Sequence, residues 1–187
     1  MNALLPNFFP CLPIRVAIAL LLYQASPLTA QTVLVEAEGF DNPGGWKADT
    51  QSVEQMGSVY ALAHGMGTPV ANATTTVSFP APGTYHVWIR TRNWVPGNWA
   101  APGQFKVSVA GVDLAPVFGT ELANWHWQDG GRVTINGLTA DVTLKDLTGF
   151  DGRCDAIAFV AGNDDPPPND LPSLKAWRRM ARPGAAW

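Results

Sequence analysis

The chain has 187 residues, of which 47% are apolar and only 14% charged, and its net charge is −3. Its 12 basic residues do not outnumber its 15 acidic ones, so the composition lacks the positive excess of a nucleic-acid-binding domain. The 18 glycines, 16 prolines and 8 tryptophans favour a loop-rich β domain with aromatic surface to spare.

Residues 1–30 have the features of a secretory signal peptide. Arg15 supplies a positive charge, residues 16–23 form a short apolar core, and small residues lead to a cleavage point after Ala30. The apolar run is far shorter than the about 20 residues that span a bilayer. We therefore expect a secreted or periplasmic protein with no membrane partner. Removal of this segment leaves one cysteine, Cys154, which we expect to be a buried structural thiol.

Residues 31–162 show the period-two alternation of half-buried strands. The alternating sets begin at Val33, Thr75, Tyr85, Phe105, Val133, Val142 and Ile157. Turn-forming pairs such as Ala110-Gly111 and Asn136-Gly137 separate them, and no amphipathic helix intervenes. The pattern predicts an all-β module, an antiparallel β-sandwich of the jelly-roll kind.

Aromatic residues are concentrated in and beside the expected loops. Trp94 and Trp99 bracket a segment too rich in turn formers for a strand interior, and Trp125 and Trp127 share one face of any strand there. Indole rings stack on the apolar faces of sugars, while oriented polar groups satisfy the hydroxyls. The predicted ligand-binding residues are Trp94, Trp99, Trp125, Trp127, Asp129, Asp151 and Arg153. The alternative is that the tryptophans fill the core and that residues 150–153 form an ordinary turn.

The composition changes after the last expected strand. Residues 163–170 are rich in Pro and Asp and are expected to form a linker. Residues 171–187 are expected to begin with a short helix that has Leu174 and Trp177 on one face and Ser173 as its N-cap. We interpret this segment as an exposed stub of a following, absent domain.

Motifs of enzyme chemistry are missing from the sequence. It contains no His-Glu-x-x-His zinc helix and no Gly-x-Ser-x-Gly nucleophile turn. Its three histidines, His64, His86 and His126, lie in separate segments without metal-ligand spacing. We therefore expect no catalytic residues and no enzyme activity in this chain.

Two sets of residues carry resemblances to known families. The segment Val35-Glu36-Ala37-Glu38, together with Asp155, resembles the calcium-anchored jelly-roll carbohydrate-binding modules of families six and thirty-five. Longer runs, including Tyr85-His86-Val87-Trp88-Ile89-Arg90-Thr91 and Gly149-Phe150-Asp151-Gly152-Arg153, are similar to the N-terminal module of secreted bacterial FAD-dependent oxidoreductases or xanthan-lyase-type proteins. The likeness covers residues 33–160 and implies a galactose-binding-domain-like fold. It also implies a flavin domain after the linker, but no Gly-x-Gly-x-x-Gly motif follows the linker in this chain.

A structural calcium ion is expected at Glu36, Glu38 and Asp155. The two glutamates are two residues apart, and therefore on one face of a strand, where like carboxylates repel. A hard cation with 6–8 oxygen ligands would neutralise them, with Asp155 and backbone carbonyls completing the shell. The alternative is that both glutamates face water on an edge strand.

Two functions follow from these features. The first is a non-catalytic carbohydrate-binding module that tethers an attached enzyme to a polysaccharide or oligosaccharide. The second is a structural accessory domain that packs against an FAD-dependent oxidoreductase domain and binds no sugar. The exposure of the tryptophans distinguishes the two, because a sugar platform requires open indole rings.

Overall fold

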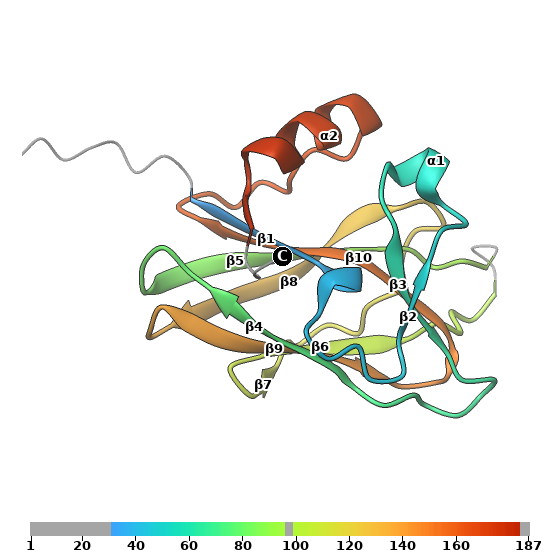
Figure 1. Cartoon of the computed structure of the whole chain (residues 1–187). Helices are drawn as coiled ribbons and strands as arrows, with labels where there is room; N and C mark the ends of the chain where they lie inside the picture. The colour runs from blue at the N-terminus through green and yellow to red at the C-terminus, as the bar shows by residue number, and fades with distance from the viewer. Residues whose placement is uncertain (1–30, 96–98, 184–187) are drawn as a thin grey trace, which may run out of the picture.

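Two β-sheets stack face to face in the computed structural model, which describes residues 31–95 and 99–183 (Figure 1). The predicted signal peptide, residues 1–30, lies outside the described residues and so stays a prediction. The all-β sandwich expected from the alternation is confirmed, and nearly all strand pairs are antiparallel. None of the helices in the described ranges is long and apolar enough to cross a membrane.

The larger sheet contains seven strands within the described residues. β10 is its centre, pairing with β1, β3 and β5, and β8 pairs with the far side of β5. The strands are β1 (Thr32–Glu36), β2 (Lys47–Asp49), β3 (Tyr60–His64), β5 (Gly83–Thr91), β8 (His126–Ile135), β10 (Phe150–Ala161) and β11 (Arg182–Pro183).

The smaller sheet has the order β4-β9-β6-β7 in the part of the chain that the structure describes. Its strands are β4 (Ala73–Ser78), β9 (Thr139–Asp146), β6 (Phe105–Val109) and β7 (Val112–Asp113). Apolar residues from alternate positions of both sheets meet between them, among them Val33, Val77, Val87, Phe105, Val142 and Phe159. The predicted turns at 110–111 and 136–137 join β6 to β7 and β8 to β9, and Ala110 and Gly111 both have positive φ.

Several elements do not follow the predicted pattern. β2 and the single-turn helix α1 (Val53–Met56) were not expected, because they are too short to show periodicity. β3 was not expected because its first four residues are an unbroken apolar run without alternation. β1 ends at Glu36, and Glu38 belongs to the 3₁₀ turn η1 (Ala37–Gly39). The two glutamates are therefore not on one strand. Residues 150–153 are not a turn but the start of β10, which is shifted in register between Phe150 and Gly152.

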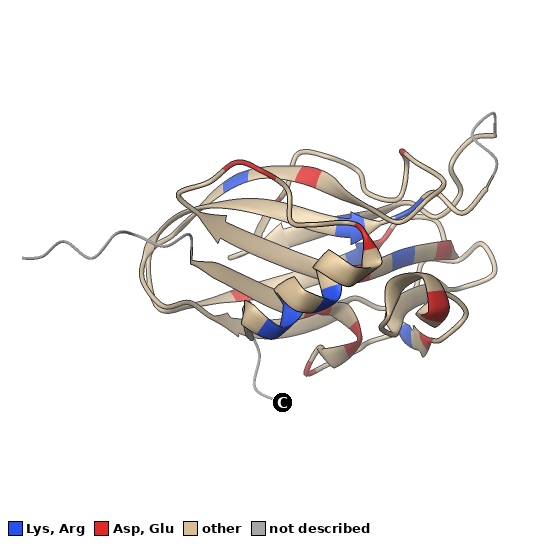
Figure 2. Cartoon of the chain, turned by 90° about the horizontal axis from the view of Figure 1, so that it is seen from above, with Lys and Arg blue, Asp and Glu red and all other residues tan. Residues whose placement is uncertain are grey.

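The helix α2 (Leu171–Met180) forms over the predicted residues but is not an exposed stub. It lies on the outer face of the larger sheet, away from the smaller one (Figure 1), and its Lys and Arg residues are blue in the view from above (Figure 2). Leu174 is fully buried there. The N-cap is Asp170, whose side chain accepts a hydrogen bond from the Ser173 amide, and not Ser173 itself.

The segment between β10 and α2 is attached to the sheet rather than free. The indole of Trp127 donates a hydrogen bond to the Pro168 carbonyl at 3.1 Å, and the Asn169 side chain donates to the Trp125 carbonyl at 2.8 Å. Asp164 forms ion pairs with His86 and Arg132. The expected linker, residues 163–170, is therefore bonded to the sheet near both of its ends. That α2 is followed by a further domain remains a prediction.

Candidate functional site

Three loops meet where β10 begins. The loop after β3 is bonded to the loop before β10, because the amides of Gly65 and Gly67 donate to the Gly149 carbonyl at 3.0 and 3.2 Å. On the other side, the Thr148 hydroxyl donates to the Pro102 carbonyl, and a Cβ on Gly103 would lie 2.7 Å from the Asp151 carbonyl oxygen. The loop that carries Trp99 therefore runs directly beside Asp151.

Exposed aromatic rings and polar side chains cluster on these loops, and we call this surface the aromatic rim: Trp94, Trp99, Phe150, Asp151, Arg153 and His64. Trp99 is 63% exposed, Phe150 51% and Trp94 37%. The residues 96–98 between the two tryptophans lie outside the described ranges. A group of exposed aromatic side chains bordered by polar residues is typical of an interaction site, so the rim is the candidate binding surface.

Trp94 is held in a fixed orientation. Its indole nitrogen donates to the Phe150 carbonyl at 3.1 Å, and the guanidinium of Arg153 lies over its ring, 5.1 Å from the centroid. Arg153 is itself oriented by a 2.8 Å hydrogen bond that it donates to the Asp151 carbonyl. The structure therefore brings together Trp94, Asp151 and Arg153, which the sequence placed in two separate segments.

The backbone at the rim adopts unusual conformations beside Phe150 and Asp151. Asp151 has a φ of +59°, which aspartate tolerates better than most residues, and its carboxylate pairs with the His64 ring. Gly67 has a φ of +88°, and a Cβ there would lie 2.9 Å from the Phe150 ring. Phe150 and His64 were not predicted as site residues. Gly149 and Gly152, on either side of Phe150, are the sequence features that could have indicated a close backbone approach here.

Trp125 and Trp127, which were predicted as ligand-binding residues, are not part of the rim and are too buried for a sugar to stack on them. They are 6% and 8% exposed. Trp125 packs edge-on against Tyr60 at 5.0 Å, and Trp127 packs edge-on against Trp177 of α2 at 5.7 Å. Neither fills the space between the sheets, which was the alternative. They are covered instead on the outer face of the larger sheet.

Asp129 also lies away from the rim. It pairs with Trp88, which is opposite Ala158, five residues along β10 from Arg153, a separation of roughly 16 Å at the usual strand rise. The Asp129 carboxylate accepts a 2.7 Å hydrogen bond from the His86 ring. The prediction that Asp129 joins Asp151 and Arg153 at one site is therefore wrong.

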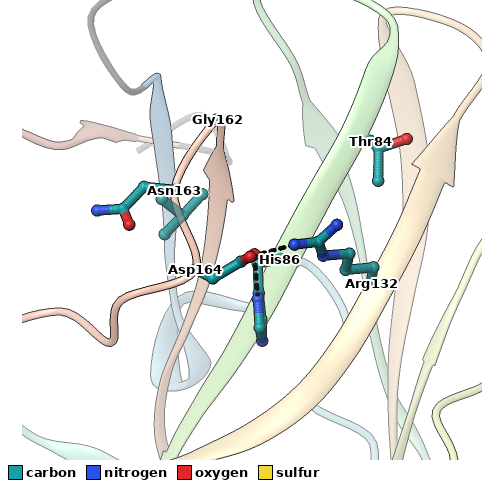
Figure 3. A pocket seen from close by; sticks show the side chains of 7 residues that line it. Thr84, His86, Arg132, Gly162, Asn163 and Asp164 are labelled. Carbon is teal, nitrogen blue, oxygen red and sulfur yellow. Dashed lines mark hydrogen bonds and ion pairs between the residues drawn. The ribbon is translucent and has the colours of Figure 1, made fainter.

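His86 is the centre of a second polar cluster, beside a hollow of about 570 Å³. Its two ring nitrogens contact the carboxylates of Asp129 and Asp164, and Arg132 also pairs with Asp164, as the dashed lines in Figure 3 show in part. Burial lowers the pKa of His86, but the hydrogen bonds to the two carboxylates outweigh it and leave the pKa raised. One face of the ring is stacked on Trp88 at 4.7 Å. The charges of this cluster are paired with one another. Its contacts with Asp164 hold that residue to the sheet.

Another hollow, of about 440 Å³, lies on the smaller sheet. It is lined by Asp41, Asn42, Thr74, Thr75, Thr76, Asp141 and Thr143. It offers hydroxyls and carboxylates but no aromatic ring, and so it lacks the apolar wall of a sugar site.

The three residues predicted to hold calcium do lie close together. Burial raises the pKa of Glu36 to about 7 against the opposing charge of Arg178. It raises the pKa of Glu38 to about 8, to which the nearby carboxylates of Glu36 and Asp155 contribute. One oxygen of each glutamate is buried without a hydrogen-bond partner. The alternative, in which both glutamates face water, is therefore wrong.

The donor set nevertheless does not fit a calcium shell. Both oxygens of Asp155 have partners, because Oδ2 accepts from Arg90 at 2.8 Å and from Arg178 at 2.6 Å while Oδ1 accepts from Ser58 at 2.9 Å. A divalent cation beside this oxygen would face two guanidinium groups. Among the described residues no three His, Cys, Asp or Glu side chains are grouped so that they could hold a metal ion.

Solved structures that share this fold include carbohydrate-binding modules. The chain is similar to the GH26-CBM35 β-(1,4)-mannanase of Podospora anserina (TM-score 0.56, 19% identity, 73% of this chain and 29% of that chain). It is similar to a family 35 carbohydrate-binding module of Clostridium thermocellum (TM-score 0.56, 18% identity, 72% and 100%). It is also similar to the C-terminal CBM6 of a marine laminarinase from Zobellia galactanivorans (TM-score 0.50, 18% identity, 69% and 98%).

These likenesses establish the fold. The chain spans less than a third of the length of the mannanase but matches the isolated modules nearly end to end. No protein-family model and no curated protein matches the chain in sequence.

Proposed function

We propose that this domain is a carbohydrate-binding module and that the aromatic rim is its ligand site. The observation that carries the proposal is the fixed, partly open indole of Trp94 beside the polar groups of Asp151 and Arg153. A ring already held in place loses little freedom on stacking against a sugar, which favours affinity. The carbohydrate-binding modules that share the fold support the proposal.

Trp94 and Trp99 are the residues that test the rim. Replacing either by alanine should weaken retention on an insoluble polysaccharide, because a lost stacking contact costs on the order of 1–3 kcal/mol by analogy with base–aromatic stacking. That is roughly a ten- to hundredfold loss of affinity. The ligand is first selected on a glycan array, and retention is then measured together with the melting temperature.

Leu138→Ala is the matched control, since Leu138 is 60% exposed in the turn after β8 and outside the rim. It should leave retention unchanged. Unchanged retention for both tryptophan variants, at unchanged melting temperature, would contradict the rim as the sugar site. A wild-type chain that retains no polysaccharide would favour the accessory-domain function instead.

The wider role that we propose is to tether an attached enzyme to its polysaccharide. Its support is the resemblance to N-terminal modules of secreted flavin enzymes and xanthan-lyase-type proteins, together with the expected signal peptide. We propose no catalytic residue in this domain. Export is tested by sequencing the N-terminus of protein recovered from the periplasm or medium, which should begin at Gln31.

A further inference from the structure

Glu36, Glu38 and Asp155 bring three carboxyl groups together in a largely buried place. The Asp155 side chain is fully buried, and that of Glu36 is 13% exposed. A buried carboxyl group must either pair with a positive charge or be held protonated, and the raised pKa values of Glu36 and Glu38 show that their pairing is incomplete. Asp155, the most deeply buried of the three, is therefore the carboxylate that most needs a positive charge within contact distance.

Two arginines supply that charge from opposite directions. Arg90 lies on β5, within the sheet, with its side chain 2% exposed. Arg178 reaches the same oxygen of Asp155 from α2, at 2.6 Å, and its Nη2 is also 3.4 Å from Glu36 Oε2. Of the two, Arg178 alone belongs to an element outside the sheet.

The position of Arg178 is set by the packing of its helix. Leu174 is one turn earlier, on the same face, and is fully buried among Leu34, Trp88 and Trp127 of the larger sheet. Trp177 packs on Trp127 from the same side. The apolar contacts therefore fix the register of α2, and this register places the Arg178 guanidinium over Asp155 and Glu36.

We infer that Arg178 takes the place that a structural divalent cation would otherwise occupy, so that α2 is the built-in counter-charge of the carboxylate group. The guanidinium is planar and has several donors, so it can bridge two carboxylates as a metal ion does. α2 is on this account an integral part of the module. The module needs no metal ion to fold.

The test compares Arg178→Gln with Arg179→Gln in the full chain, each melted in excess chelator and in excess Ca²⁺. Arg179 is the matched control because it is the next residue of the same helix and is exposed. In chelator, Arg178→Gln should melt roughly 6–20 °C below the wild type, as expected for breaking a buried ion pair in a domain of this size. Arg179→Gln should melt with the wild type. Ca²⁺ should leave the wild type unchanged and raise the melting temperature of Arg178→Gln.

Calorimetric titration of the wild-type chain with Ca²⁺ gives a second readout that needs no variant. We expect no saturable Ca²⁺ binding. This measurement tests the inference even if Arg178→Gln fails to fold. Saturable Ca²⁺ binding, or a wild-type melting temperature that falls in chelator, would overturn the inference in favour of the calcium site. Equal melting temperatures for the two arginine variants in chelator would overturn it as well.

Discussion

Tryptophans of this chain serve two different purposes, and only their surroundings separate them. Trp88 and Trp127 are buried under α2, where truncation would leave a cavity and cost about 3–5 kcal/mol of stability. Trp94 and Trp99 are open on the loops at the start of β10. Tryptophan is therefore part of the fold at one end of the larger sheet and part of the candidate ligand site at the other.

His86 should make the stability of the domain depend on pH. Its pKa is raised in the folded state because the hydrogen bonds to Asp164 and Asp129 outweigh its burial. The stabilisation is therefore fully present below the unfolded pKa of about 6.5 and is lost as the pH rises through the folded pKa. We expect the difference in melting temperature between wild type and His86→Gln to be largest at pH 5.5–6.5 and to shrink towards pH 8.5.

Asp164→Asn is the control for this pH dependence. It removes one carboxylate partner of His86 and also the ion pair with Arg132. When it is measured in an Asp164→Asn background, the effect of His86→Gln on the melting temperature should therefore be smaller and should vary less with pH. A difference that grows between pH 6.5 and pH 8.5 would contradict the assignment of the effect to His86.

At the scale of elements, α2 decides how the larger sheet is covered. Its one fully buried residue, Leu174, contacts an apolar patch that β1, β5, β8 and β10 build on their outer faces. Without the helix this patch and the carboxylates of Glu36 and Asp155 would face water. The helix therefore contributes both apolar cover and charge.

Leu174→Ala should destabilise the chain by about 2–5 kcal/mol, because it removes a fully buried aliphatic side chain. Met180→Ala on the same helix is the matched control, since Met180 is 79% exposed and should change stability by less than about 0.5 kcal/mol. Urea denaturation measures both. Equal midpoints for the two variants would show that α2 does not contribute to the stability of the module.

At the scale of the whole molecule, β10 connects all of these features. Its first residues contribute Phe150, Asp151 and Arg153 to the rim, its centre carries Asp155, and its end packs beneath α2. Cys154, next to Asp155, is fully buried in the core between the sheets. A change in the exposure of residues on this strand therefore reports on the unfolding of the entire domain.

The Cys154 thiol should react with a thiol reagent only when the domain unfolds. Burial raises its pKa well above the usual value, and the carboxylates of Asp155, Glu38 and Glu36 raise it further, so little reactive thiolate forms. The difference in labelling between wild type and Cys154→Ala isolates this thiol. It should appear in denaturant with the same midpoint as the unfolding transition, and rapid labelling in buffer would contradict the buried placement.

The sequence by itself determined the two-sheet architecture. Alternation at Val33, Tyr85, Phe105 and Ile157 is a local property, because each strand buries every second residue whatever its partner. The turn at Ala110-Gly111 was likewise readable, since only a few residue types tolerate positive φ. In the same way, Trp94, Asp151 and Arg153 could be named as candidates by residue type and position beside expected turns.

Only the tertiary structure decided which of the candidates meet and which are covered. Trp125 and Trp127 are buried because α1 and α2 lie against the outer face of the larger sheet, contacts that no local pattern encodes. Arg178 lies 23 residues from Asp155, and its pairing depends on the docking of Leu174. The separation of long-range partners along the chain leaves no period to read, so the neutralisation of the carboxylates and the position of Asp129 became evident only in the fold.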